Sequence, residues 1–133
     1  MSFSKDIGRF TVLTEKAADD IVRGVTIGLF SAVIKSTPVL DGRLIGDWQT
    51  TVGTPAPAEN GRIDKSGSAS IAEVVANTPK EAGGETFMTN NMPYAYDIEF
   101  NGHSSVKAPQ GMVRINMARI NRLVAVEVQN HRI

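Results

Sequence analysis

Residue types that could perform chemistry gather around one histidine. His103 lies beside Ser104 and Ser105, a short distance after Asp97 and Glu99. Serine, histidine and a carboxylate are the parts of a hydrolase triad, but a triad needs a base held rigidly beside its nucleophile and an oxyanion hole. The chain contains no nucleophile-elbow motif, and a Gly/Ser loop exposed to solvent is the simpler interpretation. A small hydrolase that uses His103 with Asp97 or Glu99 is therefore the least favoured hypothesis.

Other kinds of site are not indicated by the sequence. The chain has no cysteine, which excludes disulfides, thiolate zinc sites and a cysteine nucleophile. Asp97 and Glu99 are two residues apart and would share one face of a strand, as paired carboxylates do. Nothing nearby supplies further metal ligands, and we expect a solvated or interface face with an arginine partner instead. No glycine falls in a phosphate-binding motif, and Trp48, Tyr94 and Tyr96 lack the basic groove needed for stacking on bases. We expect these aromatic side chains in the core or at a contact between subunits, and we expect Met112 and Met117 in the core. We therefore expect no catalytic residue, no cofactor and no metal.

Composition points to one globular domain. The chain has 133 residues, of which 41% are hydrophobic and 21% are charged. Fourteen basic and fourteen acidic residues cancel, so no surplus of positive charge supports tight binding to DNA. Residues 1–6 lack the apolar run of a signal peptide, and no apolar stretch approaches the roughly 20 residues that span a bilayer. We expect a protein made in the cytoplasm of its host, without membrane association.

Hydrophobic periodicity predicts two long helices. Apolar side chains recur every three or four residues over about 3–36, and again over about 110–129. Pro38 is expected to end the first helix, because a proline disfavours helical angles in the residue before it. Gly24 and Gly28 either allow another backbone to approach closely or are tolerated at a cost of up to about 1 kcal/mol each.

Alternating patterns predict three strands. Residues 43–52 alternate around Trp48, residues 85–90 form a second run, and residues 94–100 carry aromatic side chains at every second position. We expect the aromatic side of this third strand to be buried. A helical turn over residues 94–99 is the main alternative.

The turn before the first strand contains three charged residues close together. Asp41-Gly42 is a turn signal. Asp41 and Asp47 flank Arg43, and a local salt bridge or turn cap is the expected arrangement.

The middle of the chain predicts a loop and a short helix. Residues 54–70 are rich in proline, glycine and serine and hold few side chains able to pack a core, which indicates a mobile loop or arm. Ser70 and Glu73 have the spacing of a capping box, with Ser70 as the N-cap of a helix that ends near Ala76.

These elements predict an α+β fold in a single domain over residues 1–133. Two long helices would pack on one face of a small antiparallel sheet, and the Pro/Gly/Ser-rich segment over about 54–70 would form an extended loop or arm. A sheet of this size leaves open edges, and the helices carry more apolar surface than so few strands can cover. Both features favour self-assembly.

Three motifs occur in order along the chain. The first is Thr37-Pro38-Val39-Leu40-Asp41-Gly42-Arg43, which leads to Asp47-Trp48-Gln49; the second is Thr89-Asn90-Asn91 with Pro93-Tyr94-Ala95 and Ile98-Glu99; the third is Ala108-Pro109-Gln110-Gly111-Met112-Val113. Together they resemble the signatures of the tailed-bacteriophage neck and tail-completion protein family, minor tail components of the head–tail junction. The resemblance covers nearly the whole chain, and residues 54–68 are its least constrained part.

The resemblance implies a structural protein of the virion without catalysis. Copies would form a homomeric ring in the neck, with six the preferred number and twelve the alternative, next to the connector or head-closure ring and the tail terminator or tail-tube proteins. DNA would pass through the channel without specific binding. A tail terminator that caps the tail tube is the alternative role. The structural or interface candidates in these motifs are Pro38, Asp41, Gly42, Arg43, Trp48, Asn91, Pro93, Tyr94, Tyr96, Glu99, Pro109, Gly111 and Arg114.

Overall fold

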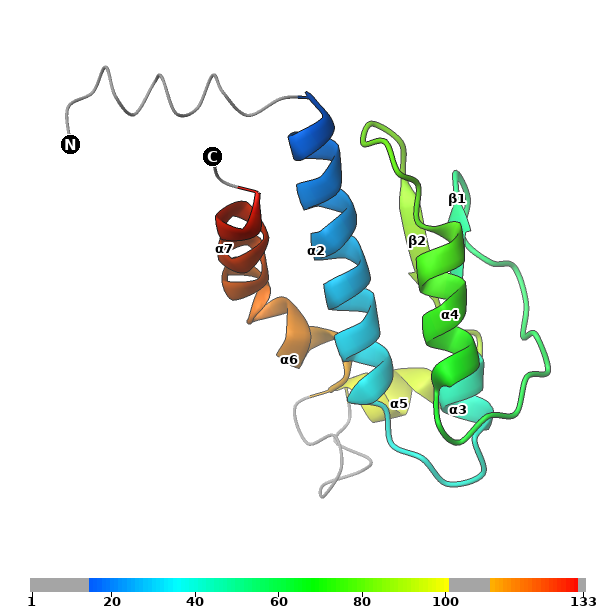
Figure 1. Cartoon of the computed structure of the whole chain (residues 1–133). Coiled ribbons are helices and arrows are strands. Elements are labelled where there is room, and N and C mark those ends of the chain that lie inside the picture. The colour runs from blue at the N-terminus through cyan, green and yellow to red at the C-terminus, as the bar shows by residue number, and fades with distance from the viewer. Residues whose placement is uncertain (1–14, 101–110, 132–133) are drawn as a thin grey trace, which may run out of the picture.

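The computed structural model describes residues 15–100 and 111–131 (Figure 1). It contains a mixture of helices and one small antiparallel sheet, which confirms the α+β class. The elements in chain order are α2 (Glu15–Lys35), α3 (Arg43–Gly46), β1 (Gln49–Val52), α4 (Ser68–Asn77), β2 (Thr86–Thr89), α5 (Ala95–Phe100), α6 (Val113–Met117) and α7 (Ile120–Asn130). No helix among these residues is long and apolar enough to cross a membrane.

Helix α2 is the central element of the fold. It ends at Lys35, and Pro38 follows within one turn, as the sequence predicts. Figure 1 shows α2 with α7 on one side and α4 on the other, and residue contacts join α2 to both. Lys16 forms an ion pair with Asp20 at 2.8 Å on the exposed side. The part of the predicted first helix that precedes Glu15 lies outside the described residues.

The predicted second long helix is divided into α6 and α7. The interruption falls at Ala118 and Arg119, where the N–H of Arg119 bonds to the carbonyl of Asn116, three residues back. The Asn116 side chain is buried and donates to the carbonyl of Met112 at 2.7 Å. Asparagine side chains that bond to nearby carbonyls compete with regular helix hydrogen bonding. Apolar residues continue at helical spacing through the break between α6 and α7. The periodicity of the sequence therefore does not reveal that the helix is divided.

The two glycines of α2 allow close approach of α7. A Cβ atom at Gly24 would overlap the carboxylate of Glu127, and one at Gly28 would lie 3.3 Å from the Leu123 side chain. Close approach at these glycines is confirmed, but the approaching groups are side chains of α7 and not the backbone that the sequence predicts.

The sheet has two strands among the described residues, and the prediction of a strand over residues 43–52 is wrong for its first half. Residues Arg43–Gly46 form α3, and only Gln49–Val52 form β1, which pairs antiparallel with β2. Leu44 and Ile45 are both buried. A helical turn directs neighbouring residues toward the same core, whereas a strand sends them to opposite faces.

The preferred strand over residues 94–100 is also wrong, and the helical alternative is confirmed. Helix α5 buries Ile98, which is 7% exposed. The expected aromatic core is absent here, because Tyr94, Tyr96 and Phe100 are 37%, 66% and 52% exposed. The rings of Tyr96 and Phe100, one helical turn apart, pack on each other with centroids 4.8 Å apart.

Helix α4 begins earlier than predicted and without a capping box. Its N-cap is Gly67, which has a φ of +76°. Asp64 accepts hydrogen bonds from the N–H groups of Ser66 (3.0 Å) and Ala69 (2.9 Å), and so satisfies the start of the helix. Ser70 therefore lies inside α4 and faces other partners.

The core forms where α2, α3, α4 and α5 meet below the sheet. Its buried members are Val33, Ile34, Leu44, Ile45, Trp48, Val74, Ile98 and Met112. Met112 is 1% exposed, as predicted for a core residue, whereas Met117 is 45% exposed and its prediction is wrong. The packing also differs from two long helices on a sheet: the short helix α4 contacts both α2 and β1, while α6 and α7 contact α2.

Candidate functional site

The motif residues meet at the end of the molecule where α2 ends. Residues 37–47, 59–65 and 90–96 come together there, and we call their outer face the turn surface. A pocket of about 310 Å³ opens on it, lined by Arg43, Asp47, Glu59, Gly61, Arg62, Ile63 and Met92.

Gly42 fixes the turn that carries this surface. Its φ is +90°, a conformation that glycine adopts without strain. A Cβ atom at this position would lie 2.8 Å from the backbone nitrogen of Lys65. Asp41 accepts a hydrogen bond from the N–H of Arg43 at 3.0 Å, and its carboxylate lies 3.4 Å from the Arg43 side chain. The expected local salt bridge therefore involves Asp41.

Asp47 has a different role from the one expected. It is 2% exposed, and its carboxylate accepts hydrogen bonds from the backbone N–H of Asn60 (2.9 Å) and Asn91 (2.6 Å) and from the Gln49 amide (3.4 Å). No basic side chain of residues 15–100 or 111–131 forms an ion pair with it. Asp47 therefore joins segments distant in sequence through backbone donors.

Replacing Asp47 with Asn is expected to lower the free energy of unfolding by about 1–2 kcal/mol. An amide offers one accepting oxygen, and its NH2 group would face donors. Urea denaturation followed by circular dichroism measures the change. Asp41→Asn is the matched control, because Asp41 is exposed and should change stability by less than about 0.5 kcal/mol. Equal effects of the two substitutions would contradict the role of Asp47.

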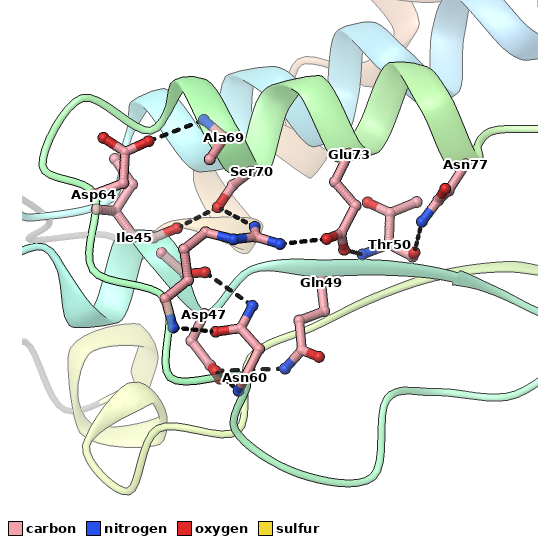
Figure 2. A network of polar contacts seen from close by, with 12 residues as sticks. Ile45, Asp47, Gln49, Thr50, Asn60, Asp64, Ala69, Ser70, Glu73 and Asn77 are labelled. Carbon is pink, nitrogen blue, oxygen red and sulfur yellow. Dashed lines mark hydrogen bonds and ion pairs between the residues drawn. The ribbon is translucent and has the colours of Figure 1, made fainter.

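A second network attaches the loop after β1 to α4 (Figure 2). Arg62 donates to the Ser70 hydroxyl at 3.1 Å and forms an ion pair with Glu73. Ser70 in turn donates to the carbonyl of Ile45 at 2.9 Å. The segment that the sequence predicts as a mobile arm is thus held against the domain, and Ala56 within it is 6% exposed.

Arg62 was not among the predicted site residues, and Ser70 and Glu73 do not form the predicted capping box. The spacing of Ser70 and Glu73 fits a capping box, but the same spacing places both on one face of a longer helix. Glu73 uses its other oxygen to accept the backbone N–H of Thr50 at 2.7 Å. The loop also contains Glu59, Asp64 and Lys65, so no local signal singled out Arg62.

Glu99 forms the third polar centre, at the junction of α5 and α6. Its carboxylate accepts hydrogen bonds from the backbone N–H of Met112 (2.7 Å), Val113 (2.8 Å) and Arg114 (3.0 Å). The Arg114 side chain lies 3.1 Å away, so the expected arginine partner is confirmed for Glu99. The expected solvated or interface face is wrong for this residue, because Glu99 is 7% exposed. The prediction that Asp97 and Glu99 share a strand face is wrong, because both lie on α5.

The pKa of Glu99 reflects two opposing causes. Burial raises it, but the hydrogen bonds from Val113, Arg114 and Met112 and the Arg114 guanidinium together hold the pKa of Glu99 below its ordinary value. Gly111 stands against this carboxylate with a φ of +85°, and a Cβ atom there would overlap Glu99. A glycine is therefore required at position 111, next to the Glu99 carboxylate.

Trp48 lies in the core, which is one of the two positions that the sequence predicts for it. It is 5% exposed, and its indole Nε1–H donates to the Thr37 hydroxyl at 2.8 Å. Thr37 donates in turn to the carbonyl of Val33 at 2.8 Å. Asn91, another candidate, donates its side-chain amide to the carbonyl of Ala56 at 2.9 Å. These hydrogen bonds hold Trp48, Thr37 and Asn91 within the scaffold of the domain.

The remaining motif residues are on or near the surface. Pro38 is half-buried, whereas Asp41, Arg43, Pro93, Tyr94 and Tyr96 are exposed. Burial and the neighbouring Asp41 carboxylate raise the pKa of Tyr94. The Arg114 guanidinium lies 5.1 Å from the centre of the Phe100 ring. Leu40 is 91% exposed and Ile63 is 61% exposed.

The residues considered for catalysis are not assembled into a site in the part that the structure describes. His103, Ser104, Ser105 and Pro109 lie outside the described residues. The Nδ1 atom of His131 lies 2.9 Å from the carbonyl oxygen of Glu127. Across residues 15–100 and 111–131, no group of three or more histidine, cysteine, aspartate or glutamate side chains is arranged to hold a metal.

The motif residues thus fall into two groups: one builds internal hydrogen-bond centres, and the other stays at the surface. Protein-family models give no match to the chain, and searches of curated proteins and of solved structures give none either.

Proposed function

We propose that this protein is a structural component of a tailed-phage virion, in which copies form a homomeric ring in the neck that joins head to tail. The proposal starts from the three motifs, whose order resembles that of the neck and tail-completion proteins. The geometry supports it in one respect above all: apolar and aromatic motif residues lie at the surface of one end of the domain.

The turn surface carries this argument. Leu40 is 91% exposed at the tip of the turn, and Ile63 beside the pocket is 61% exposed. A contiguous exposed apolar patch marks a contact between proteins, and the proposal places Leu40 and Ile63 in such a patch. The charged side chains of Asp41 and Arg43 border the same turn, and such charges fix the orientation of a partner.

A second apolar surface lies on the other side of the molecule. None of the residues of α7 is buried, and Val124 and Val126 are 40% and 50% exposed. Figure 1 shows α7 and the turn at α3 on opposite sides of α2. A ring requires two different surfaces that contact each other between neighbours, and this pair satisfies that requirement.

The neighbours of the ring follow from the same proposal. Six copies are preferred and twelve are the alternative, with the connector or head-closure ring on one side and the tail terminator or tail tube on the other. Equal numbers of basic and acidic residues suit a channel through which DNA moves without specific binding.

Replacing Leu40 with Asp is expected to weaken self-association about 10- to 100-fold and to leave the fold intact. Complete burial of a leucine contributes about 1.5–3 kcal/mol, and each 1.4 kcal/mol changes an affinity tenfold. Sedimentation velocity over a concentration series measures the association. Val75→Asp is the matched control, because Val75 is 46% exposed on α4, away from both apolar surfaces.

Phage carrying the variants test the location. Leu40→Asp should give complete heads and tails that fail to join, whereas Val75→Asp should give infectious particles. A deletion that produces overlong tail tubes would assign the terminator role, because a missing neck protein leaves tubes of normal length. Particles imaged by cryo-electron microscopy without this protein would refute the proposal.

A further inference from the structure

The outer edge of strand β1 is closed by helix α4. The backbone N–H of Thr50 donates to Glu73 at 2.7 Å, and the carbonyl of Thr50 accepts from the Asn77 amide at 2.9 Å (Figure 2). Both partners are side chains one helical turn apart on α4. Another strand therefore cannot pair with β1 at this residue unless it displaces them.

The same contacts reveal the direction of the backbone groups in β2. Thr50 faces Met88 in the register of the sheet, and its N–H and C=O point away from β2. This pair is therefore a non-hydrogen-bonded pair of the antiparallel ladder, and the N–H and C=O of Met88 also point outward. Thr86, two residues earlier, has the same orientation. The bond from the N–H of Gly53 to the carbonyl of Glu85, at 2.9 Å, fits this alternation.

The outer edge of β2 is consequently open in the part of the chain that the structure describes. Neither Thr86 nor Met88 forms an outward backbone hydrogen bond with residues 15–100 or 111–131. The strand reads Thr-Phe-Met-Thr, without the lysine, proline or bulge that commonly protects an edge. A two-stranded sheet is also marginal by itself, so added strands would stabilise it.

We propose that β2 pairs with β2 of a second copy of this chain, antiparallel about a two-fold axis. Thr86 would form a hydrogen-bonded pair with the partner's Met88, and Met88 with the partner's Thr86. Phe87 would then face the partner's Phe87 directly, at a non-hydrogen-bonded position where side chains are closest. In this register the outward N–H and C=O groups of Thr86 and Met88 all form hydrogen bonds. The register also places Glu85 opposite the partner's Thr89, so no like charges face each other.

This contact goes beyond the ring proposal and does not depend on it. A two-fold contact uses the same surface on both copies and closes on itself, whereas a cyclic ring needs two different surfaces. A pairing of four-residue strands also buries little area, so we expect a weak dimer. Covalent trapping is the suitable measurement for a contact of this strength.

The absence of cysteine from the chain makes the test specific. In the Phe87→Cys variant, the two Cα atoms would lie about 4.5–5.5 Å apart, within the range of disulfide bonds. Mild oxidation should give a disulfide-linked dimer as the main product. Thr89→Cys is the matched control, because Thr89 points to the same face of β2 and the two copies would lie about 13 Å apart at 3.3 Å per residue. It should give at least tenfold less dimer.

Two further measurements keep the proposal testable if Phe87→Cys fails to fold. The amide protons of Thr86 and Met88 in the unmodified protein should exchange more slowly as concentration rises, while the other strand amides stay unchanged. Thr86→Pro should abolish this dependence, because it removes an outward donor without removing a bond to β1. Equal trapping at both cysteine positions, or exchange independent of concentration, overturns the pairing. Neither result bears on whether the protein is found in phage particles.

Discussion

Replacing Trp48 with Ala is expected to lower the free energy of unfolding by about 3–5 kcal/mol and to leave the protein largely unfolded or aggregated. The indole is 5% exposed within the core formed by α2, α3, α4 and α5, and its removal leaves a cavity that the surrounding helices cannot fill without moving. Far-ultraviolet circular dichroism during urea denaturation measures the loss, since the chain has one tryptophan and the variant has no fluorescence probe of this kind.

Trp48→Phe separates the volume of the ring from its hydrogen bond. Phenylalanine keeps most of the apolar surface but cannot donate to the Thr37 hydroxyl, which accepts the indole N–H at 2.8 Å. We expect a loss of about 1–2 kcal/mol for this variant, clearly smaller than for Trp48→Ala. A soluble Trp48→Ala protein with unchanged stability would show that the residue does not anchor the core.

Replacing Glu99 with Ala is expected to lower the free energy of unfolding by about 2–4 kcal/mol. Three backbone N–H groups, those of Met112, Val113 and Arg114, lose their common acceptor, and the carboxylate that receives them is largely buried. Glu81→Ala is the matched control, because Glu81 is exposed between α4 and β2. Chemical denaturation of both variants at neutral pH measures the difference.

The Glu99 contribution also predicts a dependence on pH. The folded-state pKa of Glu99 lies below its ordinary value of 4.5, so its stabilisation is fully present above pH 4.5 and is lost as the pH falls through the lower folded value. The stability difference between the unmodified protein and Glu99→Gln should therefore shrink on acidification below about pH 4.5. Asp20 and Asp64, whose pKa values are also lowered, remain in both proteins and cancel in the comparison. A difference that stays constant down to pH 2 would contradict the assignment.

Local chemistry was enough to predict several elements. The end of α2 before Pro38, the strand at Thr86–Thr89 and the end of α4 near Asn77 depend on proline geometry, alternation and helical periodicity within each segment. The burial of Trp48 and the arginine partner of Glu99 were predicted correctly as well. The limits of the helices and the strand depend on residue type and on neighbours within a few positions. The burial of Trp48 and the arginine partner of Glu99 follow from general preferences for burial and for charge pairing.

The failures have a common physical cause. Residues 43–46 and 94–100 each contain a pattern compatible with a strand, and they are helical because Leu44, Ile45 and Ile98 must all reach one core. The spacing of Ser70 and Glu73 fitted a cap, but Arg62 and the backbone of β1 are their partners in space. A local pattern cannot reveal a partner that folding brings from elsewhere in the chain.

The sequence by itself determined the α+β class, the C-terminal end of the central helix, the absence of cysteine chemistry and the motifs on which the neck proposal rests. Only the tertiary structure decided that Asp47 and Glu99 are buried acceptors of backbone hydrogen bonds, and that α4 closes one edge of the sheet and leaves the other open. Periodicity and composition act along the chain, whereas hydrogen-bond acceptors and strand edges are satisfied by groups that meet only when the chain is folded.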